Sequence, residues 1–291
     1  MKYVYILNRF QLKNKCPRIA DKLKKISDQF GRDYEIIINE SLKDAKKLRN
    51  RFRDTEYIIT AIGGDGSINH ILNDLVGTKN ILSFIPFGTG NDFYRSIRNE
   101  TKPGIRKVDI IQINDRCFIN AACFGIDADI ANDEKFIHNK SIPKPLQFPA
   151  SILYHFLTFK KGRRLKIECG GKVREWEFTT IVAANCQYYG GGYRISPSSK
   201  IDDGLMEVYA ADSLRGLKLI RCILTMKKAR HLHHPAVKRI QASRVIITSP
   251  SPFKANIDGE PLCSDRFEIT LIPGGIQLEY DPQFIKEFLK K

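Results

Sequence analysis

A glycine-rich turn between an apolar run and a helical pattern constrains this chain more than any other feature. The turn reads Gly63-Gly64-Asp65-Gly66-Ser67 and follows the apolar residues 57–62. Apolar residues then recur every three to four positions from Ile68 to Leu75, which predicts a helix. Glycines let a ligand approach the backbone closely, and the N–H groups at the start of a helix suit a phosphate. This order favours a phosphate-binding loop, and an ordinary tight turn is the alternative.

A second unit of the same kind follows directly. The apolar run 81–86 ends in Phe87-Gly88-Thr89-Gly90-Asn91-Asp92, and residues 93–97 again have a helical pattern. In open α/β sheets, ligands bind beyond the carboxyl ends of the strands. Asp65 and Asp92 could therefore share one metal–nucleotide site. The chain has no G-x-x-x-x-G-K-[ST] motif, which excludes a Walker-type site, and no G-x-G-x-x-G after its first strand.

The first part of the chain alternates between strand and helix patterns. The strands expected there lie near residues 3–8, 34–39, 56–62 and 81–86. The helices expected there lie near residues 17–30, 41–53, 67–76 and 91–98. Short β–α spacings predict a parallel sheet with right-handed crossovers. We therefore expect an α/β domain over residues 1–107, to which a short helix over 281–291 returns.

The remainder of the chain is rich in strands and has two helical inserts, near 141–161 and 213–230. The strands expected there lie near residues 108–113, 116–123, 165–169, 173–186, 205–210, 244–248, 253–257, 267–271 and 275–280. Gly170-Gly171 is typical of a hairpin turn. This pattern predicts an antiparallel all-β sandwich domain over residues 108–280.

The net charge of +16 indicates an anionic partner or a basic surface that serves only solubility. We expect no nucleic acid, because neither a zinc-finger spacing nor an RNP-type motif is present. Both helical inserts combine apolar and basic residues, so they could contact an anionic membrane transiently, or they could simply cover a sheet. No apolar run reaches ~18 residues, which predicts no membrane span. Seven scattered cysteines without a C-x-x-C pair indicate reduced thiols in a cytoplasmic protein.

Two acidic turns lie in the strand-rich part. The first contains Lys200, Asp203 and Leu205, and adjacent carboxylates on a glycine turn could hold a hard cation. The second reads Asn256-Ile257-Asp258-Gly259-Glu260-Pro261, where a carboxylate could accept a proton from a hydroxyl group. Each turn alone is equally consistent with a plain Asp-Gly turn.

The four motifs together resemble the bacterial diacylglycerol kinase and lipid kinase family, whose catalytic domain sphingosine and ceramide kinases share. The resemblance rests on G-G-D-G-S-I-N-H-I-L-N-D, P-F-G-T-G-N-D-F, D-D-G-L and I-D-G-E-P, in this order, and it spans nearly the whole chain. It implies an α/β nucleotide-binding domain, an antiparallel β domain, and ATP with Mg²⁺ in the cleft between them. It also implies a lipid hydroxyl group as the acceptor, with diacylglycerol or a related lipid as substrate, and peripheral association with a membrane.

The resemblance assigns roles to single residues. It places the ATP phosphates on the turn formed by Gly63, Gly64, Asp65, Gly66, Ser67, Ile68 and Asn69, and it adds Thr89 as a further nucleotide contact. Asn8 is all that remains of the family's Asn-Pro-small-small-Gly loop, and Asn39 stands where the family has a nucleotide-contacting threonine.

The same resemblance assigns the metals and the base. Asp65, Asp92 and Asp109 would organise the catalytic Mg²⁺, and Glu260 would accept the proton of the lipid hydroxyl group. Lys200, Asp203 and Leu205 would form a structural Mg²⁺ site. An exposed sheet edge could support a homodimer. A soluble-substrate kinase related to NAD kinases, and a non-enzymatic basic protein that binds nucleic acid or membrane, remain as alternatives.

Overall fold

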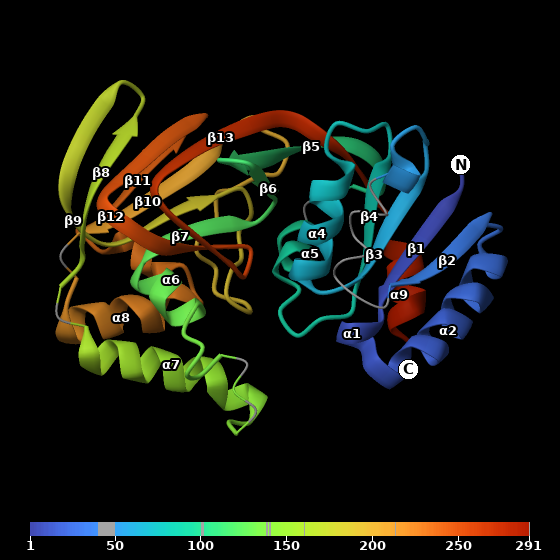
Figure 1. Ribbon diagram of the computed structural model, residues 1–291, viewed down its shortest axis with the longest axis horizontal. Coiled ribbons are helices and arrows are strands. Elements are labelled where there is room, and N and C mark those ends of the chain that lie inside the picture. The colour runs from blue at the N-terminus through green and yellow to red at the C-terminus, as the bar shows by residue number, and fades with distance from the viewer. Residues whose placement is uncertain are drawn as a thin grey trace. The chain divides into compact units, whose positions relative to one another are not determined.

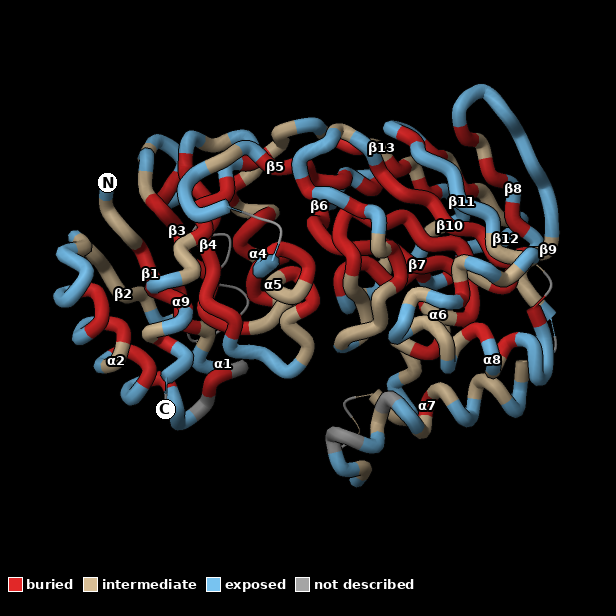
Figure 2. Tube along the Cα trace, turned by 180° about the vertical axis from the view of Figure 1, so that it is seen from behind, coloured by how far each residue is buried: buried red, intermediate tan, exposed pale blue. Residues whose placement is uncertain are grey.

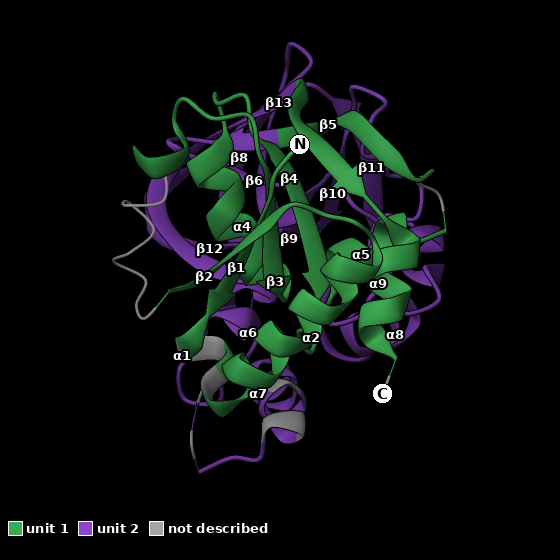
Figure 3. Cartoon of the chain, turned by 90° about the vertical axis from the view of Figure 1, so that its right-hand side faces the viewer, with its two compact units in different colours: residues 1–110, 273–291 green, residues 111–272 purple. Residues whose placement is uncertain are grey.

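The computed structural model describes residues 1–39, 50–99, 102–137, 139, 141–159, 161–212 and 214–290. Most of the helix expected near 41–53 lies outside these residues. The chain divides into two compact units, which Figure 3 shows in different colours. Unit 1 comprises Met1–Ile110 and Pro273–Lys291, and unit 2 comprises Ile111–Ile272.

Unit 1 is built on a parallel sheet, as the sequence predicts (Figure 1). Its main strands are β1 (Tyr3–Asn8), β2 (Tyr34–Asn39), β3 (Ile58–Gly63) and β4 (Ile81–Pro86), in the spatial order β4-β3-β1-β2. All neighbouring pairs among these four are parallel. The end of β13 (Glu260–Tyr280) joins them, because Gln277 and Leu278 pair in parallel with β4.

The helices of unit 1 pack on this sheet through apolar faces. They are α1 (Arg9–Leu12), α2 (Cys16–Gln29), α4 (Asp65–Leu75), α5 (Asp92–Ile97) and α9 (Pro282–Leu289), with a 3₁₀ turn over Lys13–Lys15. Ile19, Leu23 and Ile26 of α2 recur at helical spacing and bury against β1, together with Phe284 of α9. The apolar period found in the sequence is therefore the packing face of the helix.

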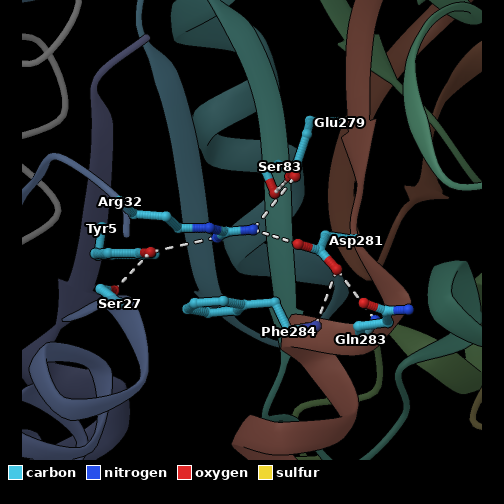
Figure 4. Close-up of polar contacts among 8 residues, drawn as sticks. All are labelled: Tyr5, Ser27, Arg32, Ser83, Glu279, Asp281, Gln283 and Phe284. Carbon is cyan, nitrogen blue, oxygen red and sulfur yellow. Dashed lines mark hydrogen bonds and ion pairs between the residues drawn. The ribbon is translucent and has the colours of Figure 1, made fainter. Parts of the chain in front are cut away.

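A buried arginine ties the C-terminal segment to the start of the chain (Figure 4). The guanidinium carbon of Arg32 lies 3.9 Å from the ring centre of Tyr3 and 3.7 Å from that of Phe284. Its Nη2 nitrogen lies 2.5 Å from an Asp281 oxygen and 3.6 Å from a Glu279 oxygen. We call this group the Arg32 cluster; it comprises Tyr3, Tyr5, Ser27, Arg32, Ser83, Glu279, Asp281 and Phe284.

Unit 2 is antiparallel and strand-rich. Its strands are β5 (Gly104–Ile113), which begins in unit 1, β6 (Arg116–Phe118), β7 (Ala121–Gly125), β8 (Arg163–Cys169), β9 (Lys172–Ala184), β10 (Met206–Asp212), β11 (Val237–Ala242), β12 (Arg244–Ile257) and the first part of β13. Strands β9 and β12 each pair with β8 along one part and with β7 along another. The strands of unit 2 are largely buried along their inner stretches (Figure 2). They enclose a core that includes Phe124, Phe253 and Phe267.

The structure corrects several strand predictions. The sequence predicts separate strands on either side of residues 249–252, but β12 runs through this segment with a shift in register between Thr248 and Phe253. Two prolines there lack the N–H groups for pairing, which makes an irregular strand look like two. Strand β13 likewise continues through Pro273-Gly274, whereas the strand predicted over 116–123 divides into β6 and β7. The hairpin at Gly170-Gly171 is confirmed.

Three helices lie at one end of unit 2 (Figures 1 and 2). They are α6 (Ile126–Ala131), α7 (Lys144–Thr158) and α8 (Gly216–Met226), followed by a 3₁₀ turn over Arg230–His233. Side chains from all three helices gather on one hydrophobic cluster, which includes Ile130, Phe156 and Leu219. Within the described residues, no helix is long and apolar enough to cross a membrane.

Candidate functional site

The carboxyl ends of the parallel strands in unit 1 bring several predicted nucleotide residues to one edge of the sheet. Asn8, the last residue of β1, is the register partner of Asn39, the last residue of β2. Gly63 at the end of β3 is the register partner of Pro86 at the end of β4. Because these strands are parallel, all four ends lie at the edge where ligands of open α/β sheets bind.

The two glycine loops that leave this edge touch each other through their backbones. A Cβ atom added to Gly88 would lie 2.4 Å from the Cα atom of Gly64, closer than any real contact. Asn91, with a φ of 52°, closes the second loop by accepting a hydrogen bond from the N–H of Gly88 and donating one to its carbonyl group. The close approach of the two loop backbones therefore requires glycine at position 88.

Asp65 joins the two loops by a side-chain contact. Its carboxylate accepts hydrogen bonds from the N–H groups of Asp92, at 3.0 Å, and Phe93, at 2.9 Å. It thereby caps the start of α5, where a negative charge is favourable. Asp92 itself is buried, and its carboxylate lies 3.8 Å from Arg95. The structure thus brings together the segments of Asp65 and Asp92, as the sequence predicts.

The turn at the start of α4 can present backbone N–H groups to a ligand, whereas several of its side chains are buried. The N–H groups of Ser67 and Ile68 bond to the carbonyl oxygen of Gly64. The preceding N–H groups, those of Asp65 and Gly66, are the ones that a helix start leaves without an intrahelical partner. The side chains of Ser67, Ile68 and Asn69 are buried, and the Asn69 side chain contacts Asn73. Thr89 on the second loop is exposed.

Asp109 occupies a different setting in unit 1. It is buried on β5, and its carboxylate accepts a hydrogen bond of 2.8 Å from the N–H of Gly274. Across the described part of the chain, no three His, Cys, Asp or Glu side chains are close enough together to hold a metal ion. Mg²⁺ in proteins usually keeps several waters and is bound by one or two carboxylates together with substrate phosphates.

In unit 2, Asp258 and Gly259 form a two-residue hairpin turn, and Glu260 follows it directly. Ile257 and Glu260 are register partners, and the φ angles of Asp258 and Gly259 are 47° and 92°. Both values are those of a type I′ turn, which favours Asp-Gly. The buried Asp258 carboxylate accepts hydrogen bonds from consecutive backbone N–H groups, those of Ile119, Asn120 and Ala121.

Asp258 is therefore the anchor of the turn that carries Glu260. Two of the three N–H groups that it binds, those of Ile119 and Asn120, belong to the residues between β6 and β7, where the predicted strand divides. Glu260 is partly exposed, and one of its oxygens lies 4.0 Å from Arg116. The Asp-Gly pair indicated this turn in the sequence. No pattern in the sequence indicated that the Asp258 carboxylate would anchor the turn, or that Arg116 would lie near Glu260.

The predicted structural cation residues share one surface turn of unit 2. The N–H of Leu205 donates a hydrogen bond of 3.0 Å to the Asp203 carboxylate. Lys200, Asp203 and Leu205 are exposed, whereas Ile201 between them is buried and holds the turn in place. One carboxylate and nearby carbonyl groups are the donor types that Mg²⁺ or Ca²⁺ accepts.

Unit 2 also contains an apolar pocket that the sequence did not reveal. Its empty volume is about 430 Å³, part of which is open to solvent. It is lined mainly by Ile130, Ile152, Tyr189, Tyr193, Ile223 and Met226. Its acidic group is Asp127, which accepts a 2.8 Å hydrogen bond from Thr180, and burial raises the pKa of this carboxyl. The pocket was missed because α6, which carries Asp127, was not predicted.

Two family sequence models divide the chain between them. The diacylglycerol kinase catalytic domain matches residues 2–116, and the YegS C-terminal NAD kinase beta sandwich-like domain matches residues 120–279. The chain belongs to the diacylglycerol kinase family of lipid kinases. Members of this family are phosphotransferases that act on an alcohol group.

Relatives and solved structures agree with this assignment. A probable YegS-like lipid kinase of Alcanivorax borkumensis is 26% identical over 85% of this chain and 83% of its own. A diacylglycerol kinase of Staphylococcus aureus is 27% identical over 86% and 82%, respectively. A diacylglycerol kinase structure from Bacillus anthracis has a TM-score of 0.68 at 21% identity, over 97% of both chains. Another structure from that organism reaches a TM-score of 0.76 at 24% identity, over 97% of this chain and 95% of the other. At these identities the structures support the fold.

Proposed function

We propose that this lipid kinase family member transfers the γ-phosphate of ATP, in the presence of Mg²⁺, to the hydroxyl group of diacylglycerol or a related lipid. The observation that carries the proposal is the meeting of four parallel strand ends and two touching glycine loops at one edge of unit 1. Phosphoryl transfer needs little covalent chemistry from the protein, so positioning and charge neutralisation account for most of the catalysis.

The nucleotide end of the reaction belongs to unit 1. The N–H groups of Asp65 and Gly66 bind phosphate oxygens at the start of α4. Asn8, Asn39 and Thr89 contact the remainder of the nucleotide from neighbouring strand ends. Mg²⁺ supplies neutralisation of the phosphate charge. Asp65, Asp92 and Asp109 hold this ion directly or through water, and a hydrated ion suits a set of carboxylates that does not form a closed cage.

The acceptor end of the reaction belongs to unit 2. Glu260 accepts the proton that leaves the lipid hydroxyl group, and Asp258 holds its hairpin turn in position. The pocket beside Asp127 takes an aliphatic chain, because its walls are apolar and its volume is within the range of small-molecule sites. The cation turn at Asp203, with the carbonyl groups of Lys200 and Leu205, stabilises unit 2 and takes no part in the chemistry.

The assay that tests this proposal uses the full chain, radiolabelled ATP, Mg²⁺ and a panel of acceptors. We expect phosphorylation of a lipid in the panel, which comprises diacylglycerol, phosphatidylglycerol, a sphingoid base and a polyprenol, and none of NAD. Asp65→Asn keeps an oxygen acceptor for the cap of α5 but removes the charge, so we expect at least tenfold lower turnover with the fold retained. Phosphorylation of NAD alone would favour a soluble-substrate kinase, and no transfer to any acceptor would favour a binding protein.

Gly88→Ala should disrupt the nucleotide edge without any change in charge. The new methyl group would overlap the backbone of Gly64, so the two loops must separate. We expect ATP affinity, measured by isothermal titration calorimetry, to fall at least tenfold and unit 1 to lose about 1–3 kcal/mol of stability. Gly66→Ala is the matched comparison, because its methyl group would meet no atom within 4 Å and should leave stability unchanged. Equal stability of the two variants would show that the loops need not touch.

A further inference from the structure

A buried asparagine connects the apolar pocket of unit 2 with the turn that carries Glu260. Asn256 of β12 is 0% exposed. Its Oδ1 atom accepts a 3.0 Å hydrogen bond from the hydroxyl group of Tyr189 and a 3.1 Å hydrogen bond from the N–H of Gly259. Tyr189 lines the pocket, and Gly259 directly precedes Glu260. One side-chain oxygen therefore binds a donor from the pocket wall and a donor from the turn.

Backbone groups fix the orientation of this asparagine. The N–H of Gly259 can only donate a hydrogen bond, so the atom that faces it is the side-chain oxygen of Asn256. The Nδ2 group then donates a 2.8 Å hydrogen bond to Oδ1 of Asn132. Asn132 in turn donates a 3.1 Å hydrogen bond to the carbonyl oxygen of Ala255, which can only accept. Because both ends of this series are backbone groups, neither amide can turn over without losing hydrogen bonds.

The pocket reaches Asn256 through two elements of its wall. Asn132 follows the last residue of α6, the helix that carries Asp127 and Ile130 of the pocket. The second element is Tyr189 itself, and burial raises the pKa of this tyrosine well above its ordinary value. Its hydroxyl group therefore keeps its proton and remains a donor to Asn256. A ligand in the pocket contacts the residue that holds this asparagine.

We propose that Tyr189 and Asn256 are positioning residues that couple the acceptor pocket to Glu260. The proposal deepens the proposed lipid kinase function, on which it rests. The Asp258 carboxylate anchors one side of the hairpin turn, and Asn256 holds Gly259 on the other. An acyl chain that fills the pocket restricts the ring of Tyr189, which keeps its hydroxyl group on Asn256 and the turn in place. Glu260 follows this turn directly, so its carboxylate is held ready to accept the proton.

A kinetic experiment on the full-length protein tests whether Tyr189 acts through Glu260. Tyr189→Phe removes the hydroxyl group but keeps the ring in the pocket wall. With dioctanoylglycerol as acceptor, we expect kcat to fall about tenfold and the KM for this lipid to stay within about twofold of wild type. In a Glu260→Gln background, the same substitution should change kcat by less than about twofold, because the group through which it acts is already lost. An undiminished tenfold fall in that background would overturn the proposal.

A matched control lies in the same unit. Tyr209 of β10 is buried, and its hydroxyl group accepts a 3.2 Å hydrogen bond from Ser196, so this contact does not include Asn256. Tyr209→Phe also removes a hydrogen-bonded hydroxyl group from unit 2, and kcat should stay within about twofold of wild type. An equal fall in kcat for the two tyrosine variants would show a general effect of lost hydrogen bonds and would refute a positioning role for Tyr189.

A second experiment needs no phosphoryl transfer. Hydrogen exchange of the full-length protein, measured by mass spectrometry without ATP, reports on the segment 256–262. Dioctanoylglycerol should slow exchange there by about threefold or more in wild type but not in Tyr189→Phe. Diacetylglycerol, whose chains are too short to fill the pocket, should have no effect on either protein.

The outcomes of the exchange experiment separate this proposal from the proposed function. Equal protection by dioctanoylglycerol in wild type and Tyr189→Phe, or no protection in wild type, would overturn the coupling between pocket and turn. Protection that depends on Tyr189, in a protein that phosphorylates no lipid, would instead refute the kinase function and leave the coupling standing.

Discussion

Glu260→Gln is expected to abolish most of the lipid kinase activity while leaving the protein folded. The substitution keeps the size and the hydrogen-bonding capacity of the side chain but removes its ability to accept a proton. A positioned general base typically contributes about 10²–10⁴-fold, so we expect kcat to fall within that range. The KM for ATP should change little, because the nucleotide residues lie in unit 1 and Glu260 lies in unit 2. Steady-state kinetics with a micellar diacylglycerol substrate measure both quantities.

A matched control for this variant lies on the same strand. Glu268 of β13 is a partly exposed glutamate that pairs with Arg244. Glu268→Gln removes an equal charge from unit 2 and should keep kcat within about twofold of wild type, since a surface ion pair contributes little. Wild-type turnover by Glu260→Gln would refute the proposed role of this carboxylate as the base.

Arg32→Ala is expected to produce the largest loss of stability in unit 1. The guanidinium group is buried between Tyr3 and Phe284 and faces the carboxylates of Glu279 and Asp281. Removal of one partner from a buried ion pair typically costs about 3–5 kcal/mol, because the other charge is left without compensation. Urea denaturation followed by far-ultraviolet circular dichroism measures the change. The fluorescence of the one tryptophan, Trp176, would report on unit 2 instead.

The loss in Arg32→Ala should also depend on pH. Burial raises the pKa of the Glu279 carboxyl, and the charge of Arg32 offsets part of this rise. With the arginine removed, this pKa rises further, so the folded state favours the neutral acid more strongly. The destabilisation should therefore be largest at neutral pH and should decrease as the pH is lowered towards the ordinary glutamate range. Arg53→Ala, which removes an exposed arginine of unit 1, is the control. A loss for Arg32→Ala that is independent of pH would exclude Glu279 as the group responsible.

Local pattern was sufficient to predict the α/β part of the fold. Apolar runs and helical periods located β1, β2, β4 and α2 within a residue or two, because buried faces repeat at the period of each element. The predictions from the sequence failed for strands whose existence or bounds depend on the strands that pair with them. Strand β11, with the sequence Val-Lys-Arg-Ile-Gln-Ala, is largely exposed, so no alternation marks it. Strand β12 continues through two prolines because it pairs with β13 both before and after them.

In the candidate site, too, some features could be predicted from the sequence and others could not. The glycine loops were visible in the sequence because their conformation needs glycine at fixed positions. Their mutual contact was not visible, because the closeness of Gly64 and Gly88 depends on the register of β3 and β4. Asp258 was recognised only as part of a turn, whereas its carboxylate binds backbone N–H groups more than a hundred residues earlier in the chain. Long-range contacts of this kind leave no local signature.

The return of residues 273–291 to unit 1 has a consequence for biosynthesis. A ribosome releases β1 long before the end of β13 and α9, because all of unit 2 is translated between them. Until that segment is released, the edge of β4 lacks the strand that pairs with it. The apolar side chains that pack with Phe284 are then exposed to solvent. Unit 1 therefore cannot complete its sheet until unit 2 and the segment that follows it have been translated. A chain truncated before residue 273 would contain residues 1–110 of unit 1 without the strand and the helix that complete this unit.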